Sequence, residues 1–416
     1  MEDKVSLEAP VDFAESQPNM SQGETISMHR NRRLTTITLV LTAIIMLPLV
    51  GPWLAGRSIR PYLEFPPITH AVTHEPFSWI VFSGLALLMV CVIGIYLACQ
   101  SPLTPREVLS QSAVGRFPWW GWPAIIWTLL AWVLAWTRFE WMRPFQALTF
   151  TPLWLGYIVV VNALTCRRIH RCMMLHRPRY FLSLFPLSAA FWWSFEYLNR
   201  FVQNWHYLGG EELTVWEYIW QATLPFATVL PAVLGTAELL SVSPRIPTGL
   251  EAGLSVDSIH RTRWGWGLFV GAAGGLLGLG LWPDYLFFLV WVAPLVLITG
   301  LRMVRGESTI FAEAARGDWR TLWAVALAAL ICGFFWELWN FYSLAHWEYT
   351  VPFVQRFELF HMPLLGYAGY LPFGLECLAV ADLCLARKFS GGAAYYYRAR
   401  AAGTDLAQRK PTVAER

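Results

Sequence analysis

Two hydrophobic runs of this chain end in the same pattern, Glu196-Tyr197-Leu198-Asn199 and Glu337-Leu338-Trp339-Asn340. The spacing between the two copies is constant, since 337 − 196 = 141 and 340 − 199 = 141. Flanking residues keep the same offset; the matched pairs are Arg179 and Arg320, Glu217 and Glu358, and Pro231 and Pro372. A spaced match of this length predicts a duplicated structural unit.

The composition is that of a membrane protein. Of the 416 residues, 56% are hydrophobic and only 14% are charged, whereas soluble globular proteins carry roughly 25% charged residues. The mean hydropathy is +0.42. The net charge of +3 is small and no basic tract is present, so we expect membrane lipid as a partner and no nucleic acid. The oligomeric state has no signature in the sequence.

Ten apolar runs have about the length that an α-helix needs to cross a bilayer. Their ranges are 34–55, 78–99, 120–137, 152–167, 180–200, 216–240, 264–282, 284–301, 320–341 and 359–385. Basic residues gather in alternate connections, among them Arg167, Arg168, Arg171, Arg302 and Arg305. By the positive-inside rule both termini are cytoplasmic. We therefore predict an all-α, multi-pass transmembrane bundle of about ten spans in the bacterial cytoplasmic (inner) membrane.

The duplication is predicted to cover four helices per copy. Trp120-Gly121-Trp122 opens the third span and Trp264-Gly265-Trp266 opens the seventh. An even number of helices per repeat gives parallel repeats, related by an axis along the membrane normal. The expected organisation is a disordered cytoplasmic tail, two added helices with an outer loop, two repeats and a second disordered tail, at 1–28, 29–116, 117–245, 260–388 and 389–416.

The repeated acids are the first candidates for chemistry. Glu196 and Glu337 are predicted near the outer ends of their helices, where a carboxylate is costly unless it is paired, protonated or facing water. We expect Glu196 and Glu337 to act as acid/base groups, Asn199 and Asn340 to orient them, and His361 to relay a proton. The alternative is that the acids reach the headgroup region and the Asn side chains join helices by hydrogen bonds.

Histidines on the predicted outer side are candidates for metal binding. His70 and His74 are four residues apart, and His206 and His346 follow the two Glu-x-x-Asn pairs at nearly equivalent places. Imidazole and carboxylate are ligands for Zn or Fe, so a divalent metal is one candidate cofactor. The alternative is that these loop histidines are solvated or hydrogen-bonded.

The segment from Trp336 to Glu376 resembles a family of uncharacterised polytopic bacterial membrane proteins. The shared pattern is W-E-x-x-N, an aromatic loop, M-P-L-L-G-Y-x-G-Y and P-F-x-x-E. The chain is also similar to the membrane-bound lycopene cyclase domain family, which duplicates a helical unit and carries a Pro-Leu-Glu-Glu motif. Here Met362-Pro363-Leu364-Leu365 lacks the paired glutamates.

Three functions are compatible with these features. The first is an integral-membrane enzyme that modifies an isoprenoid or other lipid, a small hydrophobic substrate, by acid/base chemistry. The second is a cation- or proton-coupled transporter, suggested by the repeats and by the predicted break in the tenth span. The third is a non-catalytic accessory membrane subunit. The first is favoured because the polar groups gather on one side of the membrane.

Overall fold

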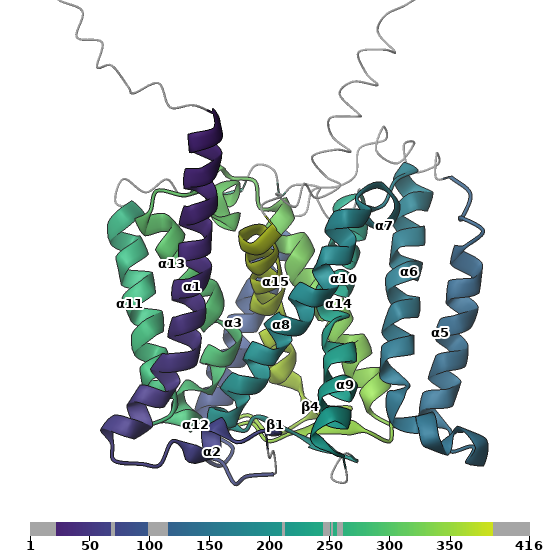
Figure 1. Ribbon diagram of the computed structural model, residues 1–416, viewed down its shortest axis with the longest axis horizontal. Coiled ribbons are helices and arrows are strands. Elements are labelled where there is room, and N and C mark those ends of the chain that lie inside the picture. The colour runs from purple at the N-terminus through teal and green to yellow at the C-terminus, as the bar shows by residue number, and fades with distance from the viewer. Residues whose placement is uncertain are drawn as a thin grey trace, which may run out of the picture.

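The computed structural model describes residues 22–67, 71–98, 115–209, 213–243, 250, 253–255 and 261–385. Figure 1 shows helices standing side by side, with short strands gathered at one end of the bundle. We call this the ribbon end. The helix α1 begins, and the helix α15 ends, at the opposite end. The mostly helical architecture confirms the predicted all-α class.

Two helix pairs form the flanks of the bundle. On one side α5 (Gly121–Trp136) packs against α6 (Phe150–Ile169), and on the other α11 (Arg261–Leu279) packs against α13 (Ala293–Val304) beside α1 (Gln22–Leu54). The glycines of the two Trp-Gly-Trp motifs allow these contacts. A Cβ on Gly121 would lie 2.8 Å from the Cβ of Ala163 in α6, and one on Gly265 would lie 2.8 Å from the Cβ of Met303 in α13.

Four helices fill the centre of the bundle: α8 (Pro178–Val202), α10 (Val229–Ser241), α14 (Arg320–Asn340) and α15 (Tyr370–Leu385). Leu184, Leu230 and Phe373 from this group are fully buried. Gly374 lets α15 approach α14, because a Cβ there would lie 2.2 Å from the Val325 carbonyl oxygen. The helix α9 (Val215–Phe226) leads into α10.

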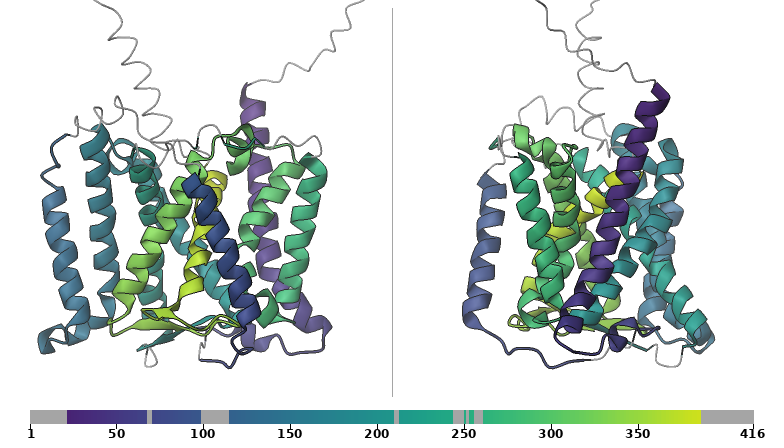
Figure 2. Two further views of the ribbon diagram at one scale, coloured as in Figure 1. Left: turned by 180° about the vertical axis from the view of Figure 1, so that it is seen from behind. Right: turned by 60° about the vertical axis from the view of Figure 1, so that its left-hand side comes forward.

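One long helix stands apart from this core. The helix α3 (Trp79–Ala98) has no buried residue, and Figure 2 shows it at the edge of the bundle. The shorter helices are α2 (Arg60–Leu63), α7 (Met173–His176), α12 (Pro283–Leu286), η1 (Glu140–Leu148), η3 (Phe287–Trp291), η4 (Ile310–Ala312), η5 (Ala314–Arg316) and η6 (Leu364–Gly369).

In the part of the chain that the structure describes, four strands lie at the ribbon end. The strand β1 (Trp205–Leu208) follows α8 and pairs in antiparallel fashion with β2 (His346–Tyr349), which follows α14. The strands β3 (Glu358–Leu359) and β4 (Met362–Pro363) form a second, smaller hairpin. Both Glu-x-x-Asn helices therefore run into the same two-stranded ribbon, although the strands are far apart in the sequence.

Several of the helices are long and apolar enough to cross a membrane. Within the described residues six qualify singly, and up to eight qualify if two bent pairs each count as one span. The pair α5 and η1 is bent by 107°, and the pair from Pro283 to Val304 by 63°. These helices are compatible with a multi-pass membrane protein, while the ranges 180–200 and 264–282 form helices that are not among the six to eight.

Two predicted boundaries differ from those of the structure. The helix α1 already includes Gln22, which lies within the range predicted as a disordered tail; residues 1–21 and 389–416 lie outside the described residues. The tenth apolar run does not start as an α-helix at residue 359. It begins with the β3–β4 hairpin, in which Phe360 has a φ of 59°, and with η6, and α15 starts only at Tyr370.

Candidate functional site

The β1–β2 ribbon sorts its side chains onto two faces. The paired residues are Trp205 with Tyr349, His206 with Glu348, Tyr207 with Trp347, and Leu208 with His346. Because successive side chains of a strand point to opposite faces, one face carries only aromatic residues: Trp205, Tyr207, Trp347 and Tyr349. The other face carries His206, Leu208, His346 and Glu348.

The two asparagines fix the start of each strand. The Asn199 amide donates to the Trp205 carbonyl at 2.8 Å, and its oxygen accepts from the Asn204 backbone N–H at 2.8 Å. The Asn340 amide donates to the Trp347 carbonyl at 2.7 Å and its oxygen accepts from the Trp347 N–H at 2.9 Å. Both side chains are fully buried. They therefore orient the loops, rather than the glutamates as the sequence suggested.

Glu196 accepts hydrogen bonds from three aromatic side chains. Its Oε1 receives the Trp192 indole N–H at 3.0 Å, the Trp205 indole N–H at 3.3 Å and the Tyr207 hydroxyl at 2.5 Å. Glu196 is 1% exposed, and its Oε2 has no hydrogen-bond partner among the described residues. One oxygen thus organises three rings while the other stays unpartnered.

Glu337 is held in a similar way. Its Oε1 accepts from the hydroxyls of Tyr349 and Tyr370, each at 2.7 Å. The Tyr349 oxygen in turn accepts from the Trp347 indole N–H at 2.8 Å. Glu337 is fully buried, and its Oε2 also lacks a partner within the described part of the chain.

The two ribbon tyrosines stay protonated at neutral pH. Burial raises the pKa of the Tyr207 and Tyr349 phenols well above 10.0, and the neighbouring Glu196 and Glu337 carboxylates raise it further. A phenol in this environment favours its neutral form. Each hydroxyl is therefore a lasting donor to its glutamate, and its oxygen lone pairs remain able to accept a proton or a hydrogen bond.

A cavity of about 680 Å³ borders the ribbon, and all four residues of the aromatic face line it. Its wall includes Trp192, Trp205 and Tyr207 around Glu196, and Trp347, Tyr349 and Tyr370 around Glu337. Glu196 and Glu337 are not among the residues that line it, but both bond to residues that do. The volume lies within the roughly 300–1,000 Å³ that is typical of small-molecule sites.

The loop between the first two predicted spans contributes to this cavity. Glu64, Phe65, Pro66 and Pro67 line it together with Tyr218, Phe226, Trp291 and Trp336, among others. The loop is tied down near its start, since the Arg200 guanidinium donates to the Tyr62 carbonyl at 2.8 Å and the Tyr62 ring stacks on Phe201. Aromatic rings thus surround the cavity on several sides.

The structure describes three of the four histidines that the sequence suggested as metal ligands. His74 Nδ1 lies 2.6 Å from Asp284 Oδ1, which joins the outer loop to α12. His70 lies outside the described residues. His206 and His346 share the polar face of the ribbon, where Nε2 of His206 lies 3.9 Å and Nε2 of His346 lies 3.7 Å from oxygens of Glu348.

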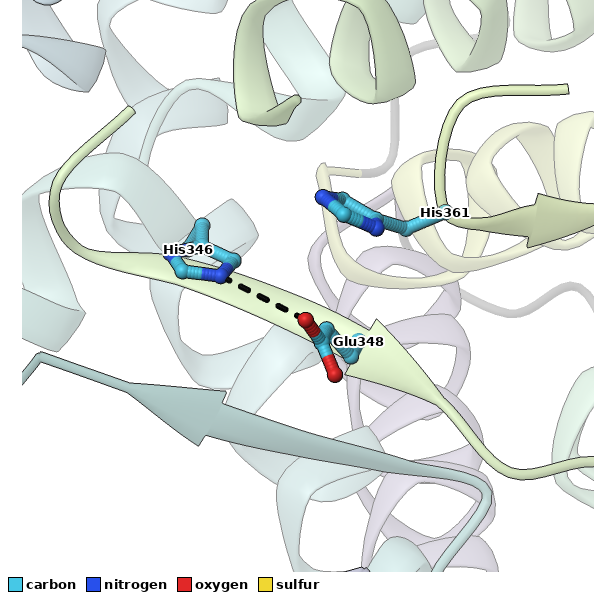
Figure 3. Close-up of side chains that lie close together, drawn as sticks. All are labelled: His346, Glu348 and His361. Atoms are coloured by element: carbon cyan, nitrogen blue, oxygen red, sulfur yellow. Dashed lines mark ion pairs between the residues drawn. The ribbon is translucent and has the colours of Figure 1, made fainter. Parts of the chain in front are cut away.

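His361 joins this polar face from another element. It sits in the two-residue turn between β3 and β4, and its ring lies 4.9 Å from Phe341 and 5.6 Å from His346. Figure 3 shows His346 and Glu348 on β2 with His361 approaching them from the hairpin. A proton relay from His361 to the glutamates stays a prediction.

The sequence reasoning missed the residues that connect the candidate acids to the cavity. Tyr207, Tyr349 and Tyr370 each donate to a candidate glutamate, and none of them is among the residues predicted from the sequence. Glu348 was missed as a partner of the histidines. The usable signal was the similarity of Trp205-His206-Tyr207 to Trp347-Glu348-Tyr349, at an offset of 142 (347 − 205 = 142) instead of 141.

A further acid is buried in the centre of the bundle. Glu376 in α15 is fully buried, and neither of its oxygens has a hydrogen-bond partner among the residues that the structure describes. It does not line the cavity.

No family model, curated protein or solved structure matches this chain. The two family resemblances seen in the sequence therefore stay predictions.

Proposed function

We propose that this protein is an integral-membrane enzyme of the bacterial cytoplasmic membrane that modifies an isoprenoid or other lipid by acid/base chemistry. The observation that carries the proposal is the 680 Å³ aromatic cavity, whose wall is hydrogen-bonded to two buried carboxyl groups. An aromatic wall suits a hydrophobic substrate. The tyrosine hydroxyls are the polar groups of this wall that would orient the substrate and exchange protons with it.

The proposed topology has ten crossings, cytoplasmic termini and an outward-facing ribbon end. Arg167 and Arg168 lie in the last turn of α6, and Arg302 lies in the last turn of α13. Both helices end on the side away from the strands (Figure 1). This distribution agrees with the positive-inside rule. The cavity would then open at the level of the outer leaflet.

The proposed duplication is supported by the symmetry of the ribbon. Exchanging the two strands maps the pair Trp205 and Tyr349 onto the pair Tyr207 and Trp347. The two asparagines make equivalent bonds to Trp205 and Trp347, and the two glutamates accept from Tyr207 and Tyr349. Such an arrangement is what two parallel repeats around one axis would produce.

The proposed chemistry uses each carboxyl and tyrosine as a pair. When the Tyr207 oxygen takes a proton from the substrate, its own proton passes to Glu196 along the 2.5 Å hydrogen bond. The reverse transfer returns the proton to the substrate or its product. Tyr349 and Glu337 form the second pair, at 2.7 Å. Surrounding indole faces can stabilise positive charge that develops on the substrate.

The test is lipid profiling of a strain that lacks the gene. We expect a lipid species that changes in this strain to return to its normal level with the wild-type gene, and not with the double variant Glu196→Gln/Glu337→Gln. Glutamine keeps an acceptor for the aromatic donors but cannot carry the proton. Glu140→Gln, at an exposed site of η1, is the matched control. Full restoration by the double variant, inserted at normal levels, would contradict the proposal.

Transport is the alternative that one observation favours. Glu376 is a buried, unpartnered acid in the middle of α15, and such residues mark proton or ion pathways in membranes. A carrier would lose uptake in vesicles on Glu376→Gln while keeping normal lipids in the cell. The enzyme proposal expects the opposite ranking, with the Glu196 and Glu337 variants more severe than Glu376→Gln.

A further inference from the structure

We propose that His346, Glu348 and His361 bind one divalent metal ion of the zinc class, with His206 as a positioning residue. One ligand atom from each of the three residues can be chosen so that all lie within 4.8 Å of one another. No candidate acid of the proposed lipid chemistry is used by this site, so it goes beyond that function.

The fold brings these side chains together from two directions. His346 and Glu348 are two residues apart in β2 and therefore point to the same face of the ribbon. His361 comes from the turn of the β3–β4 hairpin, where Phe360 takes a positive φ of 59°. Its ring is supported from behind by Phe341, at a centroid distance of 4.9 Å. Figure 3 shows the three side chains converging from these elements.

The distances suit a metal ion after small side-chain rotations. His346 Nε2 lies 3.7 Å from Glu348 Oε1. Zinc–nitrogen and zinc–oxygen bonds of about 2.0–2.2 Å in a tetrahedral site put neighbouring ligand atoms roughly 3.3 Å apart. All three residues are half-buried, and reaching this spacing needs shifts of a few tenths of an ångström to about 1.5 Å.

A second layer of interaction holds the carboxylate ligand. His206 Nε2 lies 3.9 Å from Oε2 of Glu348, while Oε1 is the oxygen nearer to His346. His206 is 6% exposed and sits opposite Glu348 in the strand register. Glu348 can therefore give one oxygen to the metal and keep the other near His206, as second-layer partners commonly do in metal sites.

The ligand set indicates the class of metal. Two imidazoles and one carboxylate occur in zinc sites with an open fourth position and in non-haem Fe(II) sites. Ca²⁺ and Mg²⁺ prefer ligand sets made of oxygen. By the strand register the ion would lie on the opposite face of the ribbon from Tyr207 and Tyr349.

The test is metal binding by the full-length protein in detergent, stripped with a chelator and then equilibrated with Zn²⁺. We expect elemental analysis by mass spectrometry to find about one zinc per chain. X-ray absorption spectroscopy should show nitrogen and oxygen ligands around the zinc and no sulfur ligand. The double variant His346→Ala/His361→Ala should lose this zinc, and Glu348→Gln should weaken its binding at least about tenfold. His206→Gln should weaken it by about 10–100-fold.

His74→Gln is the matched control, because His74 lies at the same end of the molecule but has its own partner, Asp284. It should keep the zinc, as should Glu196→Gln/Glu337→Gln, which separates this site from the lipid chemistry. Thermal unfolding checks that the variants are folded. Zinc binding by the wild type that equals that of the folded His346→Ala/His361→Ala variant, at any stoichiometry, would overturn the proposal.

Discussion

The surroundings of Glu196 and of Glu337 share one bonding pattern but use different residues, and we call each of them a corner of the site. We call the first corner Trp192, Glu196, Asn199, Trp205 and Tyr207, and the second corner Gly333, Glu337, Asn340, Trp347, Tyr349 and Tyr370. In both, an asparagine fixes a strand, and one oxygen of a buried glutamate collects aromatic donors that line the cavity.

The difference lies in where one donor comes from. Trp192 and Gly333 are related by the offset of 141 (333 − 192 = 141), and so are Val229 and Tyr370 (370 − 229 = 141). In the first corner Trp192 donates to Glu196 from the same helix. In the second corner Gly333 makes room for Tyr370, since a Cβ there would lie 2.3 Å from the Tyr370 ring. Both corners thus have a carboxylate that accepts from aromatic donors, but one of these donors is Trp192 in the first corner and Tyr370 in the second.

The largest effect is expected when Trp192 of the first corner is copied into the equivalent position of the second corner, Gly333. Gly333→Trp should clash with Tyr370 and lower the free energy of unfolding by more than about 3 kcal/mol, because overpacking of a buried site is destabilising. Gly333→Trp combined with Tyr370→Val should recover part of this loss, since it recreates the first corner's pair. Thermal unfolding in detergent measures both. A double variant that is no more stable than Gly333→Trp would count against the equivalence of the corners.

Removing either glutamate should lower the stability in proportion to the number of aromatic donors that it accepts from. Glu196→Ala leaves three aromatic donors without an acceptor, whereas Glu337→Ala leaves two. We expect losses of about 3 kcal/mol and about 2 kcal/mol, because each buried unsatisfied donor costs roughly 1–3 kcal/mol. The matched Glu→Gln variants keep an acceptor and should lose less. The reverse order of the two alanine variants in unfolding experiments would show that donor number does not set the loss.

Replacing either asparagine should destabilise the protein by a similar amount. Asn199→Ala and Asn340→Ala each free buried backbone groups at the start of a strand, which should lower stability by about 2 kcal/mol. The loss should appear first as faster amide hydrogen exchange in β1 and β2. Unchanged exchange in both strands would mean that the strands are held by other contacts.

The smallest expected effect concerns the tyrosine hydroxyls. Tyr207→Phe should cost about 1 kcal/mol at neutral pH. The folded-state pKa of Tyr207 is raised above its ordinary value of 10.0, so the contribution is fully present below that pH and is lost as the pH rises beyond it. The difference in unfolding temperature between wild type and Tyr207→Phe should therefore shrink from pH 7 to about pH 11. A constant or growing difference would contradict the raised pKa.

Much of the helical framework follows from local sequence. Apolar runs of sufficient length predict helices, and the ranges around α3, α6 and α14 match the structure closely because nothing interrupts their apolar pattern. The run from 359 differs, since Pro363 takes an extended conformation and Phe360 a positive φ, so strands and a 3₁₀ turn precede α15.

The candidate site could be predicted only in part. Glu196, Glu337 and both asparagines are visible as a repeated pattern, but the strands that complete the site are four residues long and pair over a separation of about 140 residues. Such short strands leave almost no period-2 signal, and their register depends on tertiary contacts. The role of Tyr370 depends on space left by Gly333, which only the packing of α14 against α15 reveals.

The most direct test of the account is to ask whether the cavity between the two corners holds a lipid-like ligand. Native mass spectrometry of the purified protein should detect a bound hydrophobic molecule in the wild type and in Leu224→Trp, which changes an exposed residue of α9. It should be absent from Ala222→Trp, which fills the cavity from the same helix. Equal retention by Ala222→Trp, or no bound ligand in the wild type, would contradict the central claim.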